Sequence, residues 1–373
     1  MKKKSYLSLL LLAISFCSHS QKGDFQFRFT ISGLDPIYEV GLETASEKEK
    51  HKSSIIVFRK DSTTFIAKGK LDYPCPFRIV IKKRKVSRWF FLEPGNSSLT
   101  VNFDSLYTYL KVTGSNTNEL FHNKYITHFY TYKKQDDEWW LKNSNLKNNL
   151  DALNQVIVDS MTQARINLDF QKDSLLETFV RENPKSFVGL WRLNDFFIFW
   201  GYSEKYLNAF NLLDKKIKKT FDGSTLKSKL FVAKKLSIGS IFPNLVLLDS
   251  INNKQQLSSN ISNYTLIDFW FSNCYPCIEQ FPDLKKIYTK YADKGFKVIG
   301  ISTDKIENRN KWLEAVSKYE LSWLNLWDKG GVEATKFYIQ AFPTNYLVDK
   351  SGKIIQRNIR LEELNSFLME NLH

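Results

Sequence analysis

The sequence predicts a multi-domain fold, with an N-terminal antiparallel β domain, a helical middle segment and a C-terminal α/β domain whose central mixed sheet is flanked by helices. The chain has 373 residues, of which 43% are hydrophobic, enough for roughly two or three cores of ordinary size. Its hydrophobic periodicity also changes twice along the chain. We therefore expect folded segments at residues 24–113, 118–235 and 236–373.

The first residues have the layout of a secretory signal peptide, which we place at residues 1–20. Three lysines precede an apolar run that ends at Cys17, and small polar residues follow. The run is too short to span a bilayer as a mature helix, and no later stretch approaches about 18 uninterrupted apolar residues. We expect cleavage after Ser20 and a periplasmic mature chain. The alternative is a lipoprotein anchored through Cys17, which the bulky Phe16 before it disfavours.

The segment at residues 24–113 is predicted to form an antiparallel sheet domain, such as a small sandwich. Its apolar residues alternate over short runs, and Gly, Pro, Asp, Asn and Ser turns separate these runs. The runs are FQFRFTI, SSIIVF, TTFIAKG, FRIVIKK, RWFFLE and SLTVNF.

The segment at residues 118–235 has apolar residues three and four positions apart, as in LDALNQVIVDSMTQARINL and SLLETFVRENP. This spacing is typical of helices. The stretch SFVGLWRLNDFFIFWGYS is dense in aromatic residues. It forms either a helix-packing core or a ligand-binding surface, and we favour the core.

From Ile238 onward, apolar strand runs alternate with helical stretches, which indicates a central sheet covered by helices. We expect helices from the cysteine pair to about Asp293, near Arg309 to Tyr319, and from Leu361 to the end. The expected strands are YTLIDFWF, FKVIGIST, WLNLW, TNYLVD and KIIQR.

The net charge of +15 could suggest an acidic partner such as a nucleic acid. From Leu236 onward, however, the chain contains 16 Lys and Arg residues and 15 Asp and Glu residues. The excess of basic residues therefore lies upstream, for example in KKRK at residues 82–85. That run lies inside an alternating strand-like stretch and is expected to form a solvated hairpin face. We predict no nucleic-acid partner.

The mature chain would keep three cysteines, Cys75, Cys274 and Cys277. Cys75 lies between two prolines and is expected to be a small buried apolar residue. The motif Cys-Tyr-Pro-Cys at residues 274–277 has three interpretations: a redox pair, half of a zinc site, or a structural disulfide. Zinc would require two further ligands at matching spacing, which the sequence does not offer. A disulfide that closes so small a ring constrains little chain entropy, so redox chemistry is the favoured interpretation.

The position of the pair favours the same interpretation. Cys274 follows an apolar strand and opens a predicted helix, so free backbone N–H groups and the helix dipole would stabilise its thiolate. Cys277 lies one turn further and should be more shielded. We predict that Cys274 attacks a substrate disulfide and that Cys277 then resolves the mixed disulfide.

At these residues the sequence resembles the thioredoxin superfamily, and in particular the exported TlpA-like and ResA-like thiol-disulfide oxidoreductases. GSIFPNLVLLD and LVDKSGKII resemble the opening strand and final hairpin of that group. By this resemblance, Asp268 would be a buried proton acceptor for Cys277, rather than a strand-end carboxylate pointing to water, and Pro282 would kink the active-site helix. Pro343 would be a cis proline facing the cysteines rather than an ordinary trans turn proline. The resemblance implies substrate contacts at Trp270, Tyr275, Pro276, Phe342, Pro343 and Thr344, with the Phe342 backbone pairing with substrate.

Several residues depart from the family pattern. Asn273 stands where thioredoxins usually carry tryptophan, and Gln280 takes the place of a glutamate of ResA-like proteins. Upstream, FFLEPGNSSLTV and VTGSNTNE resemble a domain of unknown function that often precedes TlpA-like domains.

The sequence therefore predicts a periplasmic thiol-disulfide oxidoreductase, more a reductase than an oxidase or isomerase, acting on disulfide-bearing envelope proteins. The family implies a membrane electron donor of the DsbD/CcdA type, with no metal and no organic cofactor. One alternative is a thiol peroxidase, although Phe271 occupies the place of the threonine expected before a peroxidatic cysteine. A second is an envelope ligand-binding protein with a non-catalytic thioredoxin-like domain.

Overall fold

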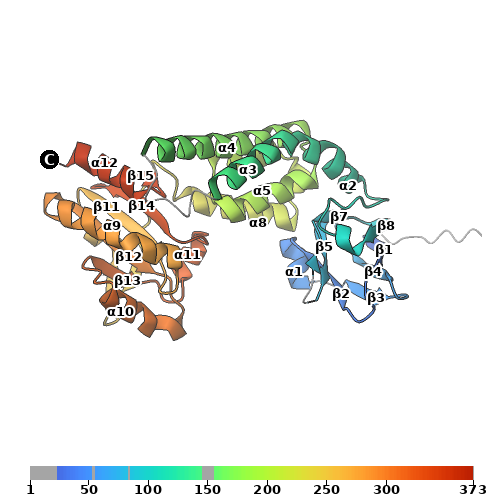
Figure 1. The fold of residues 1–373 in the computed structure, drawn as a ribbon, viewed down its shortest axis with the longest axis horizontal. Coiled ribbons are helices and arrows are strands. Elements are labelled where there is room, and N and C mark those ends of the chain that lie inside the picture. The colour runs from blue at the N-terminus through green and yellow to red at the C-terminus, as the bar shows by residue number, and fades with distance from the viewer. Residues whose placement is uncertain (1–22, 53–54, 83–84, 145–154, 373) are drawn as a thin grey trace, which may run out of the picture. The chain divides into compact units, whose positions relative to one another are not determined.

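The computed structural model describes residues 23–52, 55–82, 85–144 and 155–372. The chain divides into two compact units, Met1–Thr127 and His128–His373 (Figure 1). The expected signal peptide, with Ser20 and Cys17, lies outside the described residues. Within the described ranges, no helix is both long enough and apolar enough to cross a bilayer.

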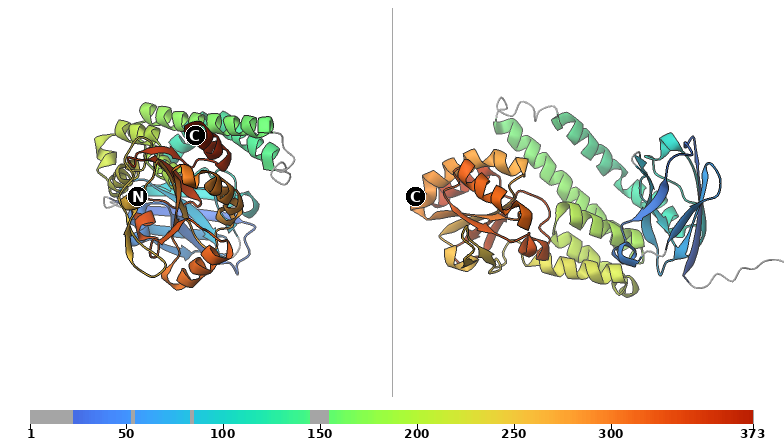
Figure 2. Two further views of the ribbon diagram at one scale, coloured as in Figure 1. Left: turned by 90° about the vertical axis from the view of Figure 1, so that its left-hand side faces the viewer. Right: turned by 90° about the horizontal axis from the view of Figure 1, so that it is seen from below.

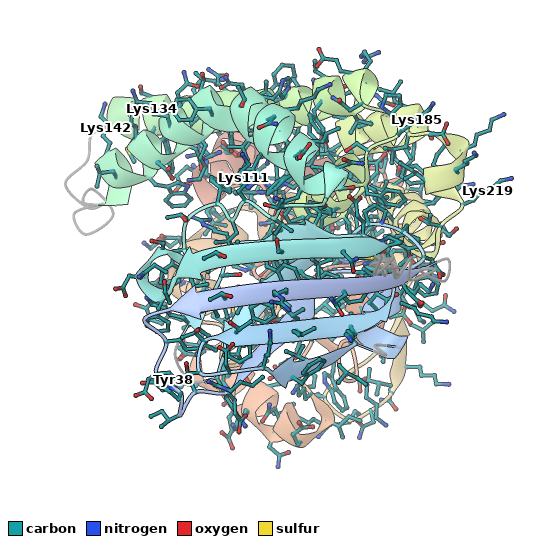
Figure 3. All side chains as sticks on the ribbon, turned by 90° about the vertical axis from the view of Figure 1, so that its right-hand side faces the viewer. Tyr38, Lys111, Lys134, Lys142, Lys185 and Lys219 are labelled. Atoms are coloured by element: carbon teal, nitrogen blue, oxygen red, sulfur yellow. A yellow bond between two sulfur atoms is a disulfide. The ribbon has the colours of Figure 1, made fainter. Side chains whose placement is uncertain are left out.

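The first unit contains two β-sheets in the described part of the chain. Along β1, Phe25, Phe27, Phe29 and Ile31 are buried and alternate with more exposed residues, as expected for a half-buried strand. One sheet has the order β3-β4-β1-β8 and faces the viewer in Figure 3. In the other, β5 pairs with β2, β6 and β7. The strands are β1 (Asp24–Ser32), β2 (Val40–Thr44), β3 (Ile56–Arg59), β4 (Thr64–Lys70), β5 (Cys75–Ile81), β6 (Lys85–Val86), β7 (Phe90–Leu92) and β8 (Gly95–Asn102), with the short helix α1 (Glu47–Lys52) after β2.

One strand pair corrects the prediction of a purely antiparallel domain. β1 pairs with β8 in parallel, with Phe25 opposite Gly95 and Phe29 opposite Leu99. The chain passes through both sheets between these strands, and this long connection allows β8 to return in the same direction as β1. Apolar alternation does not encode strand direction, so the sequence pattern could not reveal this pairing.

The beginning of the predicted helical segment is tied to the β unit. It forms α2 (Asn116–Leu120) and the π-helical turn η2 (Phe121–Ile126). The buried Asn118 side chain accepts a hydrogen bond from the Phe91 backbone at 3.1 Å and donates one to the Leu110 carbonyl at 3.3 Å. Cys75 is buried in the same unit, as predicted, and its thiol donates to the Tyr73 carbonyl.

The second unit begins with the remaining helices of the middle segment. In the aromatic helix α5, Leu193, Phe196 and Phe197 are buried, whereas Phe199 and Trp200 at its end are exposed. Most of this stretch therefore packs in the core, as predicted. The helices are α3 (Thr127–Ser144), α4 (Gln155–Glu182), α5 (Phe187–Trp200), α6 (Glu204–Leu212), α7 (Lys215–Lys218) and α8 (Phe221–Lys234).

Charged residues of the middle segment pair within it or point to solvent. α3 and α4 run side by side in Figures 1 and 2, and Arg165 of α4 pairs with Asp136 at 2.7 Å. Figure 3 labels exposed lysines on this segment, among them Lys134, Lys142 and Lys219. Some of the excess basic residues before Leu236 are therefore scattered side chains that point to solvent.

The C-terminal part of the second unit is built on a mixed sheet, which confirms the predicted α/β architecture. Its described strands have the order β10-β9-β13-β12-β11-β14-β15. β11 pairs in parallel with β12 and antiparallel with β14. The strands are β9 (Val246–Leu248), β10 (Lys254–Gln256), β11 (Tyr264–Trp270), β12 (Phe296–Ser302), β13 (Leu324–Trp327), β14 (Thr344–Asp349) and β15 (Ile354–Arg357).

Hydrophobic cores cover both faces of this sheet. Leu266 and Trp270 of β11 pack with residues of α9, α10 and α12, whereas Ile267 and Phe269 point to the opposite core, which includes Ala334 of α11. β11 is therefore buried on both sides, as its nearly continuous apolar sequence predicts. The helices are α9 (Tyr275–Tyr291), α10 (Arg309–Lys318), α11 (Val332–Lys336) and α12 (Leu361–Asn371).

Candidate active site

The cysteine pair lies where β11 turns into α9. Cys274 is the N-cap residue of α9, and its carbonyl accepts hydrogen bonds from Cys277 at 3.1 Å and Ile278 at 3.0 Å. Pro276 occupies the first turn, where a helix loses no hydrogen bond to proline. The predicted placement of Cys274 at a helix N-terminus is therefore confirmed.

The two cysteines are joined by a disulfide, with Cα atoms 5.2 Å apart. Cys274 is 3% exposed and Cys277 is 0% exposed, so the first cysteine is the more accessible one, as predicted. Among the described residues, no group of three or more His, Cys, Asp and Glu side chains could hold a metal ion. The geometry is that of a redox-capable pair, since the helix N-terminus favours a thiolate on Cys274.

The exposed edge of this turn is formed by the two residues between the cysteines and by the residue before Cys274. Tyr275 is 70% exposed, and Pro276 and Asn273 are exposed as well. These side chains can touch a large substrate without any rearrangement of the fold.

The loop before β14 approaches the same turn. The Phe342–Pro343 peptide bond is cis, as predicted. The rings of Phe342 and Phe271 meet edge to face at 5.5 Å, which places this loop beside the residue three positions before Cys274. The loop and the cysteine turn thus belong to one surface.

Two predicted substrate contacts do not lie on that surface. Trp270 is only 1% exposed and packs edge to face on Phe281 at 5.2 Å. Thr344 is buried, and its hydroxyl donates to the Ala341 carbonyl at 2.8 Å. Both side chains lie in the interior, so neither is exposed at the surface around Cys274.

Asp268 is buried beneath the site. Its side chain is enclosed by the fold, which excludes the alternative of a carboxylate pointing to water. Gln280 donates a hydrogen bond to Asp268 Oδ2 at 3.3 Å, while Oδ1 has no hydrogen-bond partner among the described residues. Burial raises the pKa of Asp268 to about 7, because a buried carboxylate loses its hydration, and the Gln280 hydrogen bond opposes this rise. Asp268 can therefore gain or lose a proton near neutral pH.

The contact between Gln280 and Asp268 was not predicted from the sequence. Gln280 lies on α9, one turn beyond Cys277, and is half-buried. Its side chain connects the active-site helix to the central strand. The sequence showed that Gln280 replaces a glutamate of ResA-like proteins. Only the structure shows that this glutamine contacts Asp268.

A second buried carboxylate, Asp304, holds the loop before Cys274. Asp304 accepts hydrogen bonds from the Ser272 backbone N–H at 2.8 Å, the Ser272 hydroxyl at 2.7 Å and the Ser302 hydroxyl at 2.8 Å. Sequence reasoning missed this residue. Its position just after FKVIGIST could have indicated its place in the site. The carboxyl ends of the parallel strands β11 and β12 lie together at one edge of the sheet, so a residue that follows β12 lies near the residues that follow β11.

Gly300 of β12 lies opposite Asp268 in the sheet, and we expect substitution of this glycine to destabilise the site. A Cβ added at Gly300 would lie 2.8 Å from Asn325 Oδ1, 3.1 Å from Trp323 Nε1 and 3.2 Å from Trp270 Nε1. Gly300→Ala should lower the free energy of unfolding by about 1–3 kcal/mol, measured by urea denaturation. Gly41→Ala is the control, since a Cβ there meets nothing within 4 Å. Equal stability of the two variants would contradict the expected crowding.

Comparison with known proteins adds two matched regions. Residues 238–357 match the AhpC/TSA family, and residues 25–121 match a domain of unknown function, DUF4369. The first region contains both cysteines and Asp268. The second covers most of the described β unit.

Several named bacterial proteins are similar in sequence to the C-terminal region of this chain. Thiol-disulfide oxidoreductase ResA from Bacillus thuringiensis subsp. konkukian is 32% identical over 151 residues, covering 40% of this chain and 86% of the relative. The thioredoxin-like protein YneN from Bacillus subtilis is 29% identical, covering 31% of this chain and 68% of the relative. Among solved structures, the thioredoxin domain of a thiol-disulfide oxidoreductase from Bacteroides vulgatus is 30% identical with a TM-score of 0.35, covering 37% of this chain and 99% of that chain.

Proposed function

Since the chain belongs to the family of thiol-disulfide oxidoreductases that includes ResA, we propose that it reduces disulfides of proteins in the periplasm through Cys274 and Cys277. The observation that carries the proposal is the cysteine pair at the N-terminus of α9, joined as a disulfide and bordered by exposed residues. Such a pair can exchange between dithiol and disulfide without a change of fold.

The reductive cycle begins with the dithiol form. The Cys274 thiolate attacks one sulfur of a substrate disulfide, which forms a mixed disulfide and releases the other substrate sulfur as a thiolate. The Cys277 thiolate then attacks the Cys274 sulfur, which forms the intramolecular disulfide and releases the second substrate sulfur. Two electrons pass to the substrate, so a dithiol donor must reduce the pair again. A membrane donor of the DsbD/CcdA type fits that role, and the sulfur chemistry itself requires no cofactor.

Asp268 is proposed to accept the proton of the Cys277 thiol before the second step. A general base works best when its pKa lies near the working pH, and burial raises the pKa of Asp268 to about 7. Its Oδ1 atom, without a hydrogen-bond partner among the described residues, is the free acceptor. Gln280 holds the other oxygen in place.

Substrate contacts are proposed on the surface that surrounds Cys274. Tyr275 and Pro276 border one side, and Phe342 with Pro343 borders the other. The backbone of Phe342 would pair with the main chain of the substrate, which recognises an extended polypeptide independently of its sequence. A disulfide held in this way would face the cysteine turn.

The direction of electron flow is tested by the reduction potential of the cysteine pair, measured by equilibration with thiol buffers. We expect a value near or below the roughly −270 mV of thioredoxin, together with reduction of a protein disulfide by the dithiol form. A potential near the roughly −120 mV of DsbA would overturn the reductase assignment in favour of an oxidase or isomerase.

The residue at position 271 does not support the alternative of a thiol peroxidase, because it is a phenylalanine and not a threonine. This residue occupies the position where a threonine hydroxyl would assist a peroxidatic cysteine, and its ring packs on Phe342. Peroxide consumption by the reduced protein, measured beside disulfide reduction, separates the two activities. If the cysteine pair is inactive in both assays and the protein binds a small ligand, the result would instead favour the binding-protein alternative.

A further inference from the structure

An open groove runs along α9 away from the cysteine turn. A hollow of about 460 Å³ begins at Asn273 and Tyr275, on either side of Cys274. It continues into a second hollow of about 760 Å³ between α9 and the end of α10. The two hollows share Lys318 and Tyr319. We call this continuous depression the α9–α10 groove.

The lining of the groove is rich in positive charge. It includes five lysines and two glutamates, whereas the whole segment from Leu236 onward has 16 basic and 15 acidic residues. Lysines therefore outnumber acidic residues along this groove, although the domain as a whole is almost neutral. The lysines are Lys285, Lys286, Lys290, Lys311 and Lys318, and the glutamates are Glu314 and Glu320.

Three of these lysines are available for a ligand. Lys290, Lys311 and Lys318 are exposed, and among the described residues no carboxylate lies within 4 Å of their ammonium groups. Lys318 extends over the ring of Tyr319, with 5.2 Å from Nζ to the ring centroid. Lys285 pairs with Glu320 at 2.9 Å, in an exposed ion pair of the kind that contributes little to stability and can exchange partners.

The floor of the groove is apolar. Phe281 and the half-buried Tyr319 lie beneath the lysines, and Pro282 lies at its side. Such a lining suits a polypeptide segment that presents carboxylates to the lysines and aliphatic groups to the floor. A free phosphate ion would use the charges but not the apolar floor.

We propose that the α9–α10 groove binds an acidic stretch of the polypeptide whose disulfide is exchanged at Cys274. The proposal rests on the proposed function and adds a substrate class: proteins with Asp or Glu residues near the reactive cysteine. Because the groove starts beside Tyr275, the acidic stretch lies close in sequence to that cysteine. Charge complementarity of this kind mainly raises the rate of encounter and selects among partners.

The test compares three disulfide peptides that differ only in their flanking residues, which are acidic, uncharged or basic. We expect kcat/KM for the acidic peptide to exceed that for the basic peptide by about tenfold at low salt, and the difference to shrink as ionic strength rises. The double variant Lys311→Glu/Lys318→Glu should reverse the order, and Lys311→Gln/Lys318→Gln should abolish the preference. Lys297→Glu/Lys350→Glu is the control, since these exposed lysines lie at the opposite end of the sheet.

Binding of cysteine-free versions of the peptides, measured by fluorescence anisotropy, separates this proposal from the proposed function. Equal affinity for the acidic and basic peptides would overturn the proposal, even if all disulfides are reduced. Tighter binding of the acidic peptide without reduction of any disulfide would support the groove and overturn the reductase activity. A dimer that the double variant dissociates would assign the groove to a second copy of the chain and also overturn the proposal.

Discussion

Cys277→Ser should accumulate a mixed disulfide with its substrate, whereas Cys274→Ser should lose disulfide exchange by more than about a hundredfold. The difference follows from the position of the two sulfurs. Cys274 caps α9, where the helix dipole stabilises a thiolate, and it is the less buried of the two. Without Cys277, the first exchange step still proceeds, but no internal thiol remains to release the substrate.

The trapped species can be detected by non-reducing electrophoresis and by the mass of the intact adduct. Cys75→Ser is the control, because Cys75 is buried in the first unit and a serine hydroxyl can replace the thiol that donates to Tyr73. This variant should exchange disulfides at the normal rate. If Cys274→Ser traps the substrate and Cys277→Ser does not, the two roles are reversed.

Much of the C-terminal fold could be predicted because its sequence signals are local. YTLIDFWF is apolar except for Thr265 and Asp268 and forms the doubly covered strand β11, and the helix after Cys274 begins at the cysteine pair. Burial of Asp268 and the cis bond before Pro343 were also anticipated, through the family resemblance. These features depend on residues that lie within a short stretch of chain or within a recognisable motif.

The missed features depend on contacts between distant parts of the chain. The β1–β8 pairing joins strands at opposite ends of the first unit, and the contact of Asp304 with Ser272 crosses from one strand end to the next. Trp270 and Thr344 were placed on the substrate surface because motif positions do not reveal which way a side chain points. The short strands β2 and β10 carry too few residues to show a period.

Asp268→Asn should make the chain more stable in alkaline solution. The pKa of Asp268 is about 7 in the folded chain, against about 3.9 in an unfolded chain. Between these values the folded chain binds a proton that the unfolded chain lacks, so the free energy of unfolding decreases as the pH rises from about 4 to about 7. The loss is on the order of 4 kcal/mol at pH 8. Asparagine carries no charge, so urea denaturation of the variant should show much of this loss recovered.

The same substitution should slow disulfide exchange near neutral pH by about tenfold or more, because general-base assistance is lost. The rate should be followed from about pH 5 to pH 9, with single-turnover conditions that isolate release of the mixed disulfide from its formation. In the normal chain this release should accelerate as the pH rises through about 7, where Asp268 ionises, and the variant should lack that rise. Asp293→Asn is the matched control, since Asp293 is exposed in the turn after α9. An unchanged rate of disulfide exchange in Asp268→Asn near pH 7 would exclude the proton-acceptor role. If the variant also gains stability, Asp268 affects the stability of the core and not the reaction.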